Sequence, residues 1–322
     1  MRSDEATSVL ASITRTGPED LNITVEEGRS DWEETVAETN AGLACSVTPL
    51  DLFGVPGELV DLPGPAGLDS PVVLLLHGGG YTSGSPRTHR ELAMRLAERC
   101  GGPVVLPDYR LAPEYPCPAA IEDAVSAYRW LLAQGHRSDR IVIIGDSAGG
   151  GLTAAALVAI RDGGLSRPAG AVLLSPWTDL TRTGESYESR PEADPFITNE
   201  GLQRAAAHYL GELEPRTPAA SPLFADLRDL PPLLIHVGEL EILFSDSTLF
   251  AARAKDAGVD VTLKIWDGLW HVFHLWSGDV PEAREAIGEI GGFVQAVTAR
   301  AEPIVGGAGG GIRTRTGFPG AF

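Results

Sequence analysis

The chain is poor in cysteine, and the few cysteines it has are badly spaced for a structural role. Only three occur in 322 residues, at Cys45, Cys100 and Cys117. An odd number of widely separated cysteines without a C-x-x-C pair argues against a disulfide framework and against a zinc site. We therefore expect no bound metal, and we expect the protein to be located in the cytoplasm, which is a reducing compartment.

Clusters of positive charge are also missing. The formal net charge is −19, with an isoelectric point near 4.7, and no group of lysines and arginines stands out. Binding to nucleic acid needs a basic footprint on the protein, so we expect no nucleic-acid partner. The excess of acidic residues is typical of a solvated surface that keeps a protein in solution.

Long hydrophobic runs are absent as well. The longest uninterrupted apolar runs fall far short of the ~20 residues that a membrane-spanning helix needs, so we expect no membrane insertion. The first residues, Met1 to Glu5, include two acidic side chains, and no continuous apolar segment follows them. This pattern predicts no secretory signal.

The chain does contain short apolar runs that alternate with amphipathic segments, as in an α/β protein. This alternation predicts a mostly parallel central sheet with helices on both faces. The predicted strands are Glu58 to Leu62, Pro71 to Leu76, Val104 to Leu106, Arg140 to Ile144, Ala171 to Leu174, Leu233 to Val237 and Val261 to Trp266. The predicted helices are Thr88 to Arg99, Ala119 to Gln134, Leu152 to Ile160, Ser247 to Asp256 and Glu282 to Ala299.

One long interval breaks this alternation. Between Ser175 and Pro231 the sequence shows no convincing strand, although Glu200 to Leu210 has a helical pattern. A segment of this length inside a compact domain usually either has a function or forms structure of its own. We expect residues 178–230, together with residues 1–45, to form a helical cap on a single domain spanning residues 1–300. The glycine-rich stretch within residues 301–322 predicts a disordered tail.

Two glycine-rich motifs each follow a predicted strand. Gly145 to Gly149 reads G-D-S-A-G, a G-x-S-x-G pentapeptide, and it is followed by a predicted helix. A strand, a tight turn and a helix in this order form a nucleophile elbow, which exposes a serine hydroxyl above the sheet. His77 to Gly80 reads H-G-G-G and follows an earlier strand, where such folds place the loop that binds an oxyanion. Ser147 is therefore the candidate nucleophile.

An elbow serine needs a basic histidine, which comes last in the chain order serine, acid, histidine. Of seven histidines, only His271 and His274 follow the predicted strand at 233–237. His271 lies just beyond the last predicted strand, in a loop that can reach back over the sheet. We favour His271 as the base and expect His274 to be a packing residue.

The acid that orients the histidine is expected directly after the strand that ends at Val237. Glu239, Glu241 and Asp246 all satisfy this condition, and position alone does not choose among them. A carboxylate here would hold the histidine tautomer and stabilise the imidazolium ion. Asp246 has a second interpretation, because negative charge is favourable at the start of a helix.

Five motifs together resemble the hormone-sensitive-lipase-like esterases, a bacterial branch of the α/β-hydrolases. The resemblance covers about Pro56 to Ala299. The matching residues are His77-Gly78-Gly79-Gly80-Tyr81, Asp108-Tyr109-Arg110-Leu111-Ala112-Pro113-Glu114, Gly145-Asp146-Ser147-Ala148-Gly149-Gly150, Ser175-Pro176-Trp177 with Asp179, and Leu269-Trp270-His271.

The resemblance implies roles for particular residues. It implies that Glu241, two residues before Leu243, is the acid, although most members of the family have aspartate there. It implies oxyanion donors at the backbone N–H groups of Gly79, Gly80 and Ala148, which suit this task because they are rigid. Asp146 is interpreted as a structural hydrogen-bond anchor. The residues expected to narrow the substrate pocket flank the motifs and are Tyr81, Trp177 and Trp270.

These observations predict a serine carboxylesterase that hydrolyses short-chain acyl esters through an acyl-enzyme, with no cofactor. A lactone hydrolase would use the same groups on a cyclic ester. An amidase or peptidase is disfavoured, because nothing indicates a charged pocket for a peptide terminus. A ligand-binding protein without activity would typically lack one member of the triad. The expected partner is a small ester, and a homodimer is left open.

Overall fold

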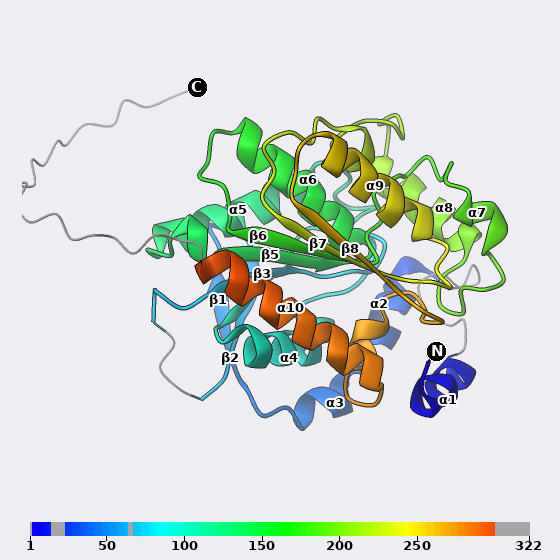
Figure 1. Ribbon diagram of the computed structural model, residues 1–322, viewed down its shortest axis with the longest axis horizontal. Coiled ribbons are helices and arrows are strands. Elements are labelled where there is room, and N and C mark those ends of the chain that lie inside the picture. Colours follow the sequence, from blue (N-terminus) through cyan, green and yellow to red (C-terminus); the bar gives the residue numbers. More distant parts are fainter. Residues whose placement is uncertain (1, 14–22, 64–66, 300–322) are drawn as a thin grey trace, which may run out of the picture.

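The computed structural model describes residues 2–13, 23–63 and 67–299, in which eight strands form one sheet (Figure 1). The strand order is β1-β2-β4-β3-β5-β6-β7-β8. All neighbouring strands are parallel except at β2, which runs antiparallel to both β1 and β4. The strands are β1 (Ser46–Asp51), β2 (Pro56–Asp61), β3 (Val72–Leu76), β4 (Val104–Pro107), β5 (Ile141–Asp146), β6 (Gly170–Leu174), β7 (Leu233–Gly238) and β8 (Val261–Trp266).

Helices cover both faces of this sheet, as the sequence predicts. Helices α5 (Ala119–Ala133), α6 (Ala148–Asp162) and α9 (Phe244–Asp256) lie on one face, and α4 (Arg90–Cys100) and α10 (Pro281–Ala299) lie on the other (Figure 1). The predicted α/β architecture is therefore confirmed. Because both faces are covered, the central strands can be apolar throughout, and every residue of β3 and β5 is buried.

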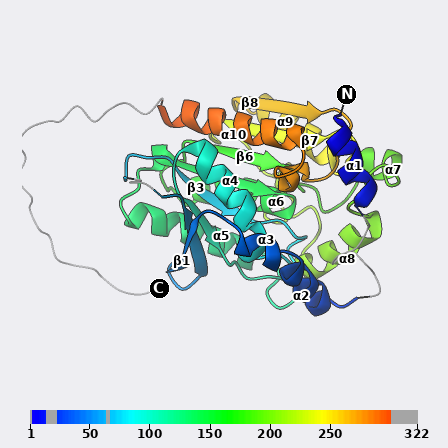
Figure 2. The same cartoon turned by 90° about the horizontal axis from the view of Figure 1, so that it is seen from below.

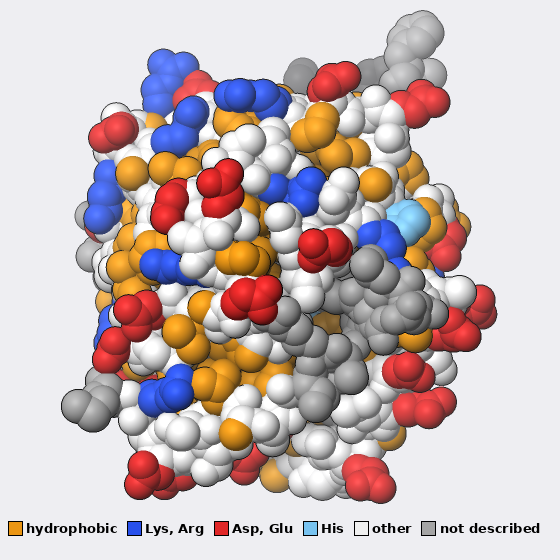
Figure 3. Space-filling model, turned by 90° about the vertical axis from the view of Figure 1, so that its right-hand side faces the viewer, with side chains coloured by type: hydrophobic (Ala, Val, Ile, Leu, Met, Phe, Trp, Pro, Cys, Tyr) orange, Lys and Arg blue, Asp and Glu red, His pale blue; other side chains and the backbone are white. Residues whose placement is uncertain are grey.

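The remaining helices are α1 (Asp4–Ser12), α2 (Val25–Thr35), α3 (Ala37–Ala41), α7 (Ser186–Ser189) and α8 (Asn199–Leu210). Of these helices, α3 lies beside α4, and the other four gather at the end toward which the parallel strands run (Figures 1 and 2). No strand occurs in residues 175–232, all of which are described. Figure 3 looks onto this end of the molecule, where exposed apolar side chains lie among scattered charged ones.

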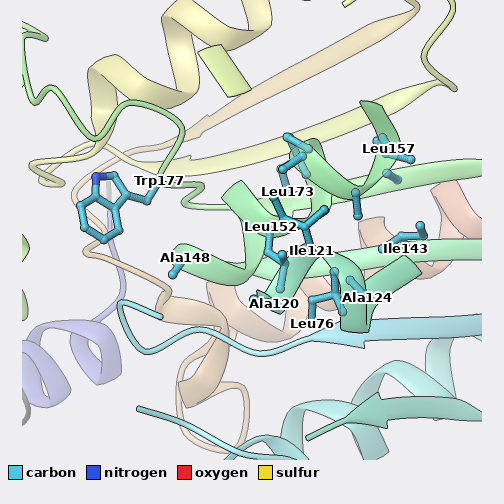
Figure 4. Close-up of a cluster of buried hydrophobic side chains, with 14 of the residues drawn as sticks. Leu76, Ala120, Ile121, Ala124, Ile143, Ala148, Leu152, Leu157, Leu173 and Trp177 are labelled. Carbon is cyan, nitrogen blue, oxygen red and sulfur yellow. The ribbon is translucent and has the colours of Figure 1, made fainter. Parts of the chain in front are cut away.

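Alternate residues of each central strand face the two helical layers. Leu76 and Ile143 pack in the larger apolar cluster with α5 and α6 (Figure 4), whereas Val73 and Val142 pack in the cluster under α4 and α10. The sheet thus holds two separate cores. The register between β3 and β5 pairs Leu76 with Gly145, so the two glycine-rich loops leave the sheet side by side.

The structure differs from the predicted elements at several points. Strand β1 was not expected, because most of its residues are exposed and it lacks an apolar run. Helix α6 begins at Ala148, four residues before the predicted start. The sequence places the start too late because the first turns contain three glycines, which are poor helix formers. Strand β2 begins two residues earlier than predicted, at Pro56.

Two further expectations concern the ends of the chain and membranes. The tail predicted for residues 301–322 lies outside the described residues. Among the residues that are described, no helix has the length and apolar character needed to cross a lipid bilayer.

Candidate active site

Ser147 lies in the turn between β5 and α6. Its backbone angles are φ 53° and ψ −122°, a conformation that non-glycine residues rarely adopt. Neighbouring glycines make the tight turn sterically feasible. A Cβ atom on Gly145 would lie 2.1 Å from the carbonyl oxygen of Gly149, and one on Gly149 would lie 2.0 Å from that of Leu76. The turn therefore has the geometry expected of a nucleophile elbow.

The side chain of Ser147 meets His271, which comes from the loop after β8. Ser147 Oγ lies 2.9 Å from His271 Nε2, and His271 Nδ1 lies 3.0 Å from Glu241 Oε2. Glu241 follows β7 and is fully buried, and His271 is only 2% exposed. Three separate loops at the carboxyl edge of the sheet thus bring a hydroxyl, an imidazole and a carboxylate into one hydrogen-bonded series.

The second oxygen of Glu241 has partners of its own. Glu241 Oε1 accepts a hydrogen bond from Ser175 Oγ at 2.6 Å and from the backbone N–H of Gly238 at 2.5 Å. Burial raises the pKa of Glu241, and the hydrogen bonds from His271, Ser175 and Gly238 oppose this rise because they stabilise the carboxylate. The carboxylate is thus held in one orientation by donors on both oxygens.

The two other acids that follow β7 are directed elsewhere. Glu239 is exposed, and its Oε2 accepts from the backbone N–H of Gly268 at 2.9 Å. Asp246 is buried in the first turn of α9, and its Oδ1 accepts from the backbone N–H groups of Thr178 and Asp179. Burial raises the pKa of Asp246 to about 8. Asp246 therefore connects α9 to the segment after β6 rather than acting as a surface helix charge.

The glycine loop after β3 lies beside the elbow. Gly79 and Gly80 both have positive φ angles, 118° and 62°, and a Cβ on Gly79 would lie 2.3 Å from the carbonyl oxygen of Ser83. Ala148, the third predicted oxyanion donor, is the first residue of α6 and follows Ser147 directly. The three backbone positions thus belong to two loops that leave neighbouring strands.

Asp146 links these two loops. It is buried, and its Oδ1 accepts from the backbone N–H of Gly78 at 3.0 Å. Its carboxylate also lies within 3.3 Å of His89 Nε2. Burial raises the pKa of Asp146, but the nearby His89 outweighs this effect, so its pKa is lowered overall. Asp146 thus anchors the glycine loop through a hydrogen bond, as interpreted from the sequence.

The three aromatic residues predicted for the pocket are all buried. Tyr81 stacks on Tyr209 of α8, with ring centroids 3.6 Å apart, and lies 6.0 Å from Trp177. Figure 4 shows Trp177 beyond the end of α6 that carries Ala148. Trp270 packs in a small cluster with α1 and α10, and its ring lies 5.6 Å from that of Trp276. A pocket role for these residues stays a prediction.

Sequence reasoning missed several residues near His271 and the glycine loop. The ring of Phe196 lies 6.1 Å from that of His271 and packs edge-on against Trp276. Tyr209 and Phe196 both come from residues 178–230, where no recognisable motif indicates function. The helical pattern at 200–210 predicts α8, but the face that meets Tyr81 is visible only in three dimensions.

Comparisons with known proteins agree with this geometry. A family model described as the alpha/beta hydrolase fold matches residues 73–275. An acetyl-hydrolase from Streptomyces hygroscopicus is 43% identical over 252 residues, covering 78% of this chain and 84% of that protein. An esterase from Acinetobacter venetianus is 35% identical over 291 residues, covering 90% and 95%.

A solved structure gives the same result. The crystal structure of an esterase from the bacterial hormone-sensitive lipase family superposes with a TM-score of 0.88 at 43% identity, covering 92% of this chain and 99% of that one. The resemblance that the five motifs indicate is therefore confirmed over almost the whole chain.

Proposed function

Because the chain belongs to the α/β-hydrolase fold family, we propose that it is a serine carboxylesterase that hydrolyses short-chain acyl esters. The observation that carries the proposal is the hydrogen-bonded series from Ser147 through His271 to Glu241 on a nucleophile elbow. The similarity to a protein named acetyl-hydrolase supports a short acyl group.

In the first half of the reaction Ser147 Oγ attacks the ester carbonyl carbon, and its proton passes to His271 Nε2. His271 Nδ1 donates to Glu241 Oε2, so the carboxylate selects the tautomer with a free Nε2 lone pair and then stabilises the imidazolium. As the tetrahedral intermediate collapses, His271 returns the proton to the leaving alcohol.

The negative charge of the intermediate needs donors that are already in position. The backbone N–H groups of Gly79, Gly80 and Ala148 are the proposed donors, since the two loops that carry them leave neighbouring strands beside Ser147. In the second half of the reaction water attacks the acyl-enzyme, and His271 again accepts and then returns a proton. The carboxylic acid leaves and Ser147 is restored.

We further propose that the helices at the carboxyl end of the sheet act as a cap that limits the size of the substrate. Tyr209 of α8 stacks on Tyr81, and Arg29 of α2 donates to the backbone oxygen of Thr82 at 2.7 Å. These contacts join α2 and α8, which belong to the described parts of residues 1–45 and 178–230, to the glycine loop. Together with the sheet these segments would form the single domain of residues 1–300.

The test is a panel of 4-nitrophenyl esters with acyl chains of increasing length. We expect the highest kcat/KM for chains of roughly two to six carbons, and a loss of about 10⁴- to 10⁶-fold in kcat for Ser147→Ala with an unchanged melting temperature. A Ser147→Ala protein that keeps a tenth of the wild-type rate would refute the serine mechanism. Maximal activity on long-chain triglycerides would refute the proposed substrate class.

We propose the cytoplasm as the compartment. Cys45, Cys100 and Cys117 are free thiols, the state that a reducing compartment maintains. Fractionation of the cells that produce the protein, followed by the ester assay on each fraction, tests this assignment. Activity in the medium or envelope fraction would contradict it.

A further inference from the structure

The end of β6 and the segment directly after it take no part in the proposed chemistry. They nevertheless form hydrogen bonds with two of the triad residues and with the residue that follows the third. The backbone oxygen of Leu174 accepts from the N–H of Ser147 at 2.8 Å, and the N–H of Trp177 donates to the oxygen of Ser147 at 2.9 Å. Between these two residues lies Ser175, in the S-P-W motif whose role the mechanism leaves open.

Ser175 makes two side-chain hydrogen bonds, and both lead to the triad. Its hydroxyl donates to Glu241 Oε1 at 2.6 Å and accepts from the backbone N–H of Val272 at 3.1 Å. Val272 directly follows His271. A single hydroxyl thus joins the acid to the loop that carries the base. The side chain of Ser175 is fully buried.

The backbone at both ends of this link is strained. Ser175 has φ 48°, and Val272 also has φ 48°, which is unfavourable for a β-branched residue. Glycine would adopt this conformation more easily than serine. A serine at such a position indicates that the hydroxyl itself is needed. Its bond to the N–H of Val272 also holds the strained peptide that sets the direction of His271.

We propose that Ser175 is a positioning residue, whose hydroxyl fixes the orientation of Glu241 relative to His271. The inference rests on the proposed esterase function and deepens it. The glutamate side chain has one more rotatable bond than aspartate, so it needs a donor on the oxygen that does not face His271. The hydroxyl of Ser175 and the N–H of Gly238 donate to that oxygen from the ends of two different strands.

Loss of the hydroxyl changes the site in two ways. Glu241 keeps its bonds to His271 and Gly238 but is held less rigidly, and its carboxylate loses a donor that stabilises the charged form, so it binds a proton more tightly. The Glu241–His271 pair then takes up its first proton at a higher pH. Asp146, Asp194 and His274 also face His271, and their charges are the same in every variant used below.

The experiment compares Ser175→Ala and Ser175→Gly with the wild type on a short-chain 4-nitrophenyl ester. We expect kcat to fall about 10- to 100-fold, the usual effect of one hydrogen bond to a charged group, with little change in KM. The acid limb of the kcat/KM profile moves to higher pH in both variants. Ser175→Gly also relieves the positive φ, so it melts at a higher temperature than Ser175→Ala while losing as much rate.

Ser221→Ala is the matched control. Ser221 is also fully buried, and its hydroxyl donates to the backbone oxygen of Pro215 and accepts from the N–H of Leu180. We expect this variant to lose stability without a shift of the pH profile. A shift of the same size in Ser221→Ala would overturn the proposal.

Two other results would also overturn it, and they are distinguishable. If the wild type hydrolyses the ester and both Ser175 variants keep their kcat within about twofold or keep the wild-type pH profile, the positioning role alone is wrong. If the wild type hydrolyses no ester in the panel, the proposed function fails and this inference fails with it.

Discussion

Single residues after β7 show how one strand end can carry three acids with different roles. Glu241 is buried against His271, Glu239 is exposed, and Asp246 bonds to the backbone after β6. Spacing in the sequence places all three within a few residues of one another. The three acids differ in burial and in their hydrogen-bond partners, and both properties depend on loops from distant parts of the chain.

These different surroundings predict that removing each charge lowers kcat by a different factor. We expect Glu241→Gln to lower kcat by about 10³- to 10⁴-fold, because the amide no longer stabilises the imidazolium or its tautomer. Glu239→Gln should change kcat by no more than a few-fold. Steady-state kinetics beside melting temperatures measure both effects. If Glu239→Gln loses the rate while Glu241→Gln keeps it, the assignment of the acid is wrong.

The raised pKa of Asp246 predicts a pH dependence of stability. Burial, with the nearby charge of Asp179, raises the pKa from the ordinary value of 3.8 to about 8. The folded state therefore holds a proton that the unfolded state releases. The stability contributed by this group is complete below about pH 4 and is lost as the pH rises toward about 8.

Urea unfolding of the wild type and Asp246→Asn at pH 5 and at pH 8.5 tests this prediction. The variant cannot ionise at this position, so we expect its stability relative to the wild type to improve as the pH rises. A difference that stays constant between the two pH values would show that Asp246 does not titrate in this range.

Among the elements, α2 illustrates a helix that its own sequence indicates only weakly. Its start is fixed by a capping box, in which Thr24 and Glu27 bond to each other's backbone N–H groups. Its position is fixed by Arg29, which donates to the backbone oxygens of Thr82 and Ala112 and pairs with Glu114. The Thr24–Glu27 box is local, but residues 1–45 lack a clear apolar stripe, and the contacts of Arg29 that place the helix are tertiary.

We predict that Arg29→Ala destabilises the protein by about 1–3 kcal/mol, since it removes charged donors to partly buried backbone oxygens. The control is Arg228→Ala, which removes an exposed ion pair with Asp226 and should cost at most about 1 kcal/mol. Urea unfolding at one pH measures both. Equal losses in the two variants would mean that Arg29 is only another surface charge.

For the whole molecule, the alternating pattern of the sequence predicts the parallel sheet and its two helical layers. It does not predict that β2 lies between β1 and β4, or that β4 lies outside β3. Strand order depends on pairing between distant segments, whereas hydrophobic periodicity reports only local structure. The edge strand β1 escapes prediction for a different reason, because most of its residues are exposed and carry little local signal.

The net charge of −19 is also a property of the whole molecule and predicts an effect of salt on substrate choice. A negative field repels anionic esters and attracts cationic ones. Raising the ionic strength from about 0.01 M to about 0.1 M shortens the screening length from roughly 30 Å to roughly 10 Å. We expect kcat/KM to rise for an ester that carries a carboxylate, to fall for one that carries a quaternary ammonium, and to stay constant for a neutral ester.

The three esters should share one leaving group, so that only the charge of the acyl part differs. A parallel response of all three to salt would point to a change in the enzyme rather than to its field. Acidic side chains are visible around the face in Figure 3, together with several basic ones. The test therefore measures the net field at the site rather than the charge of the molecule as a whole.

The order of the strands in the chain has a consequence for how activity arises during synthesis. Ser147, Glu241 and His271 follow β5, β7 and β8, and β8 is an edge strand that pairs only with β7. A nascent chain on the ribosome therefore cannot bring the three proposed triad residues together until β8 has emerged and docked. In refolding experiments, the return of ester hydrolysis would accordingly report that β8 has paired with β7, and not merely that the two cores have collapsed.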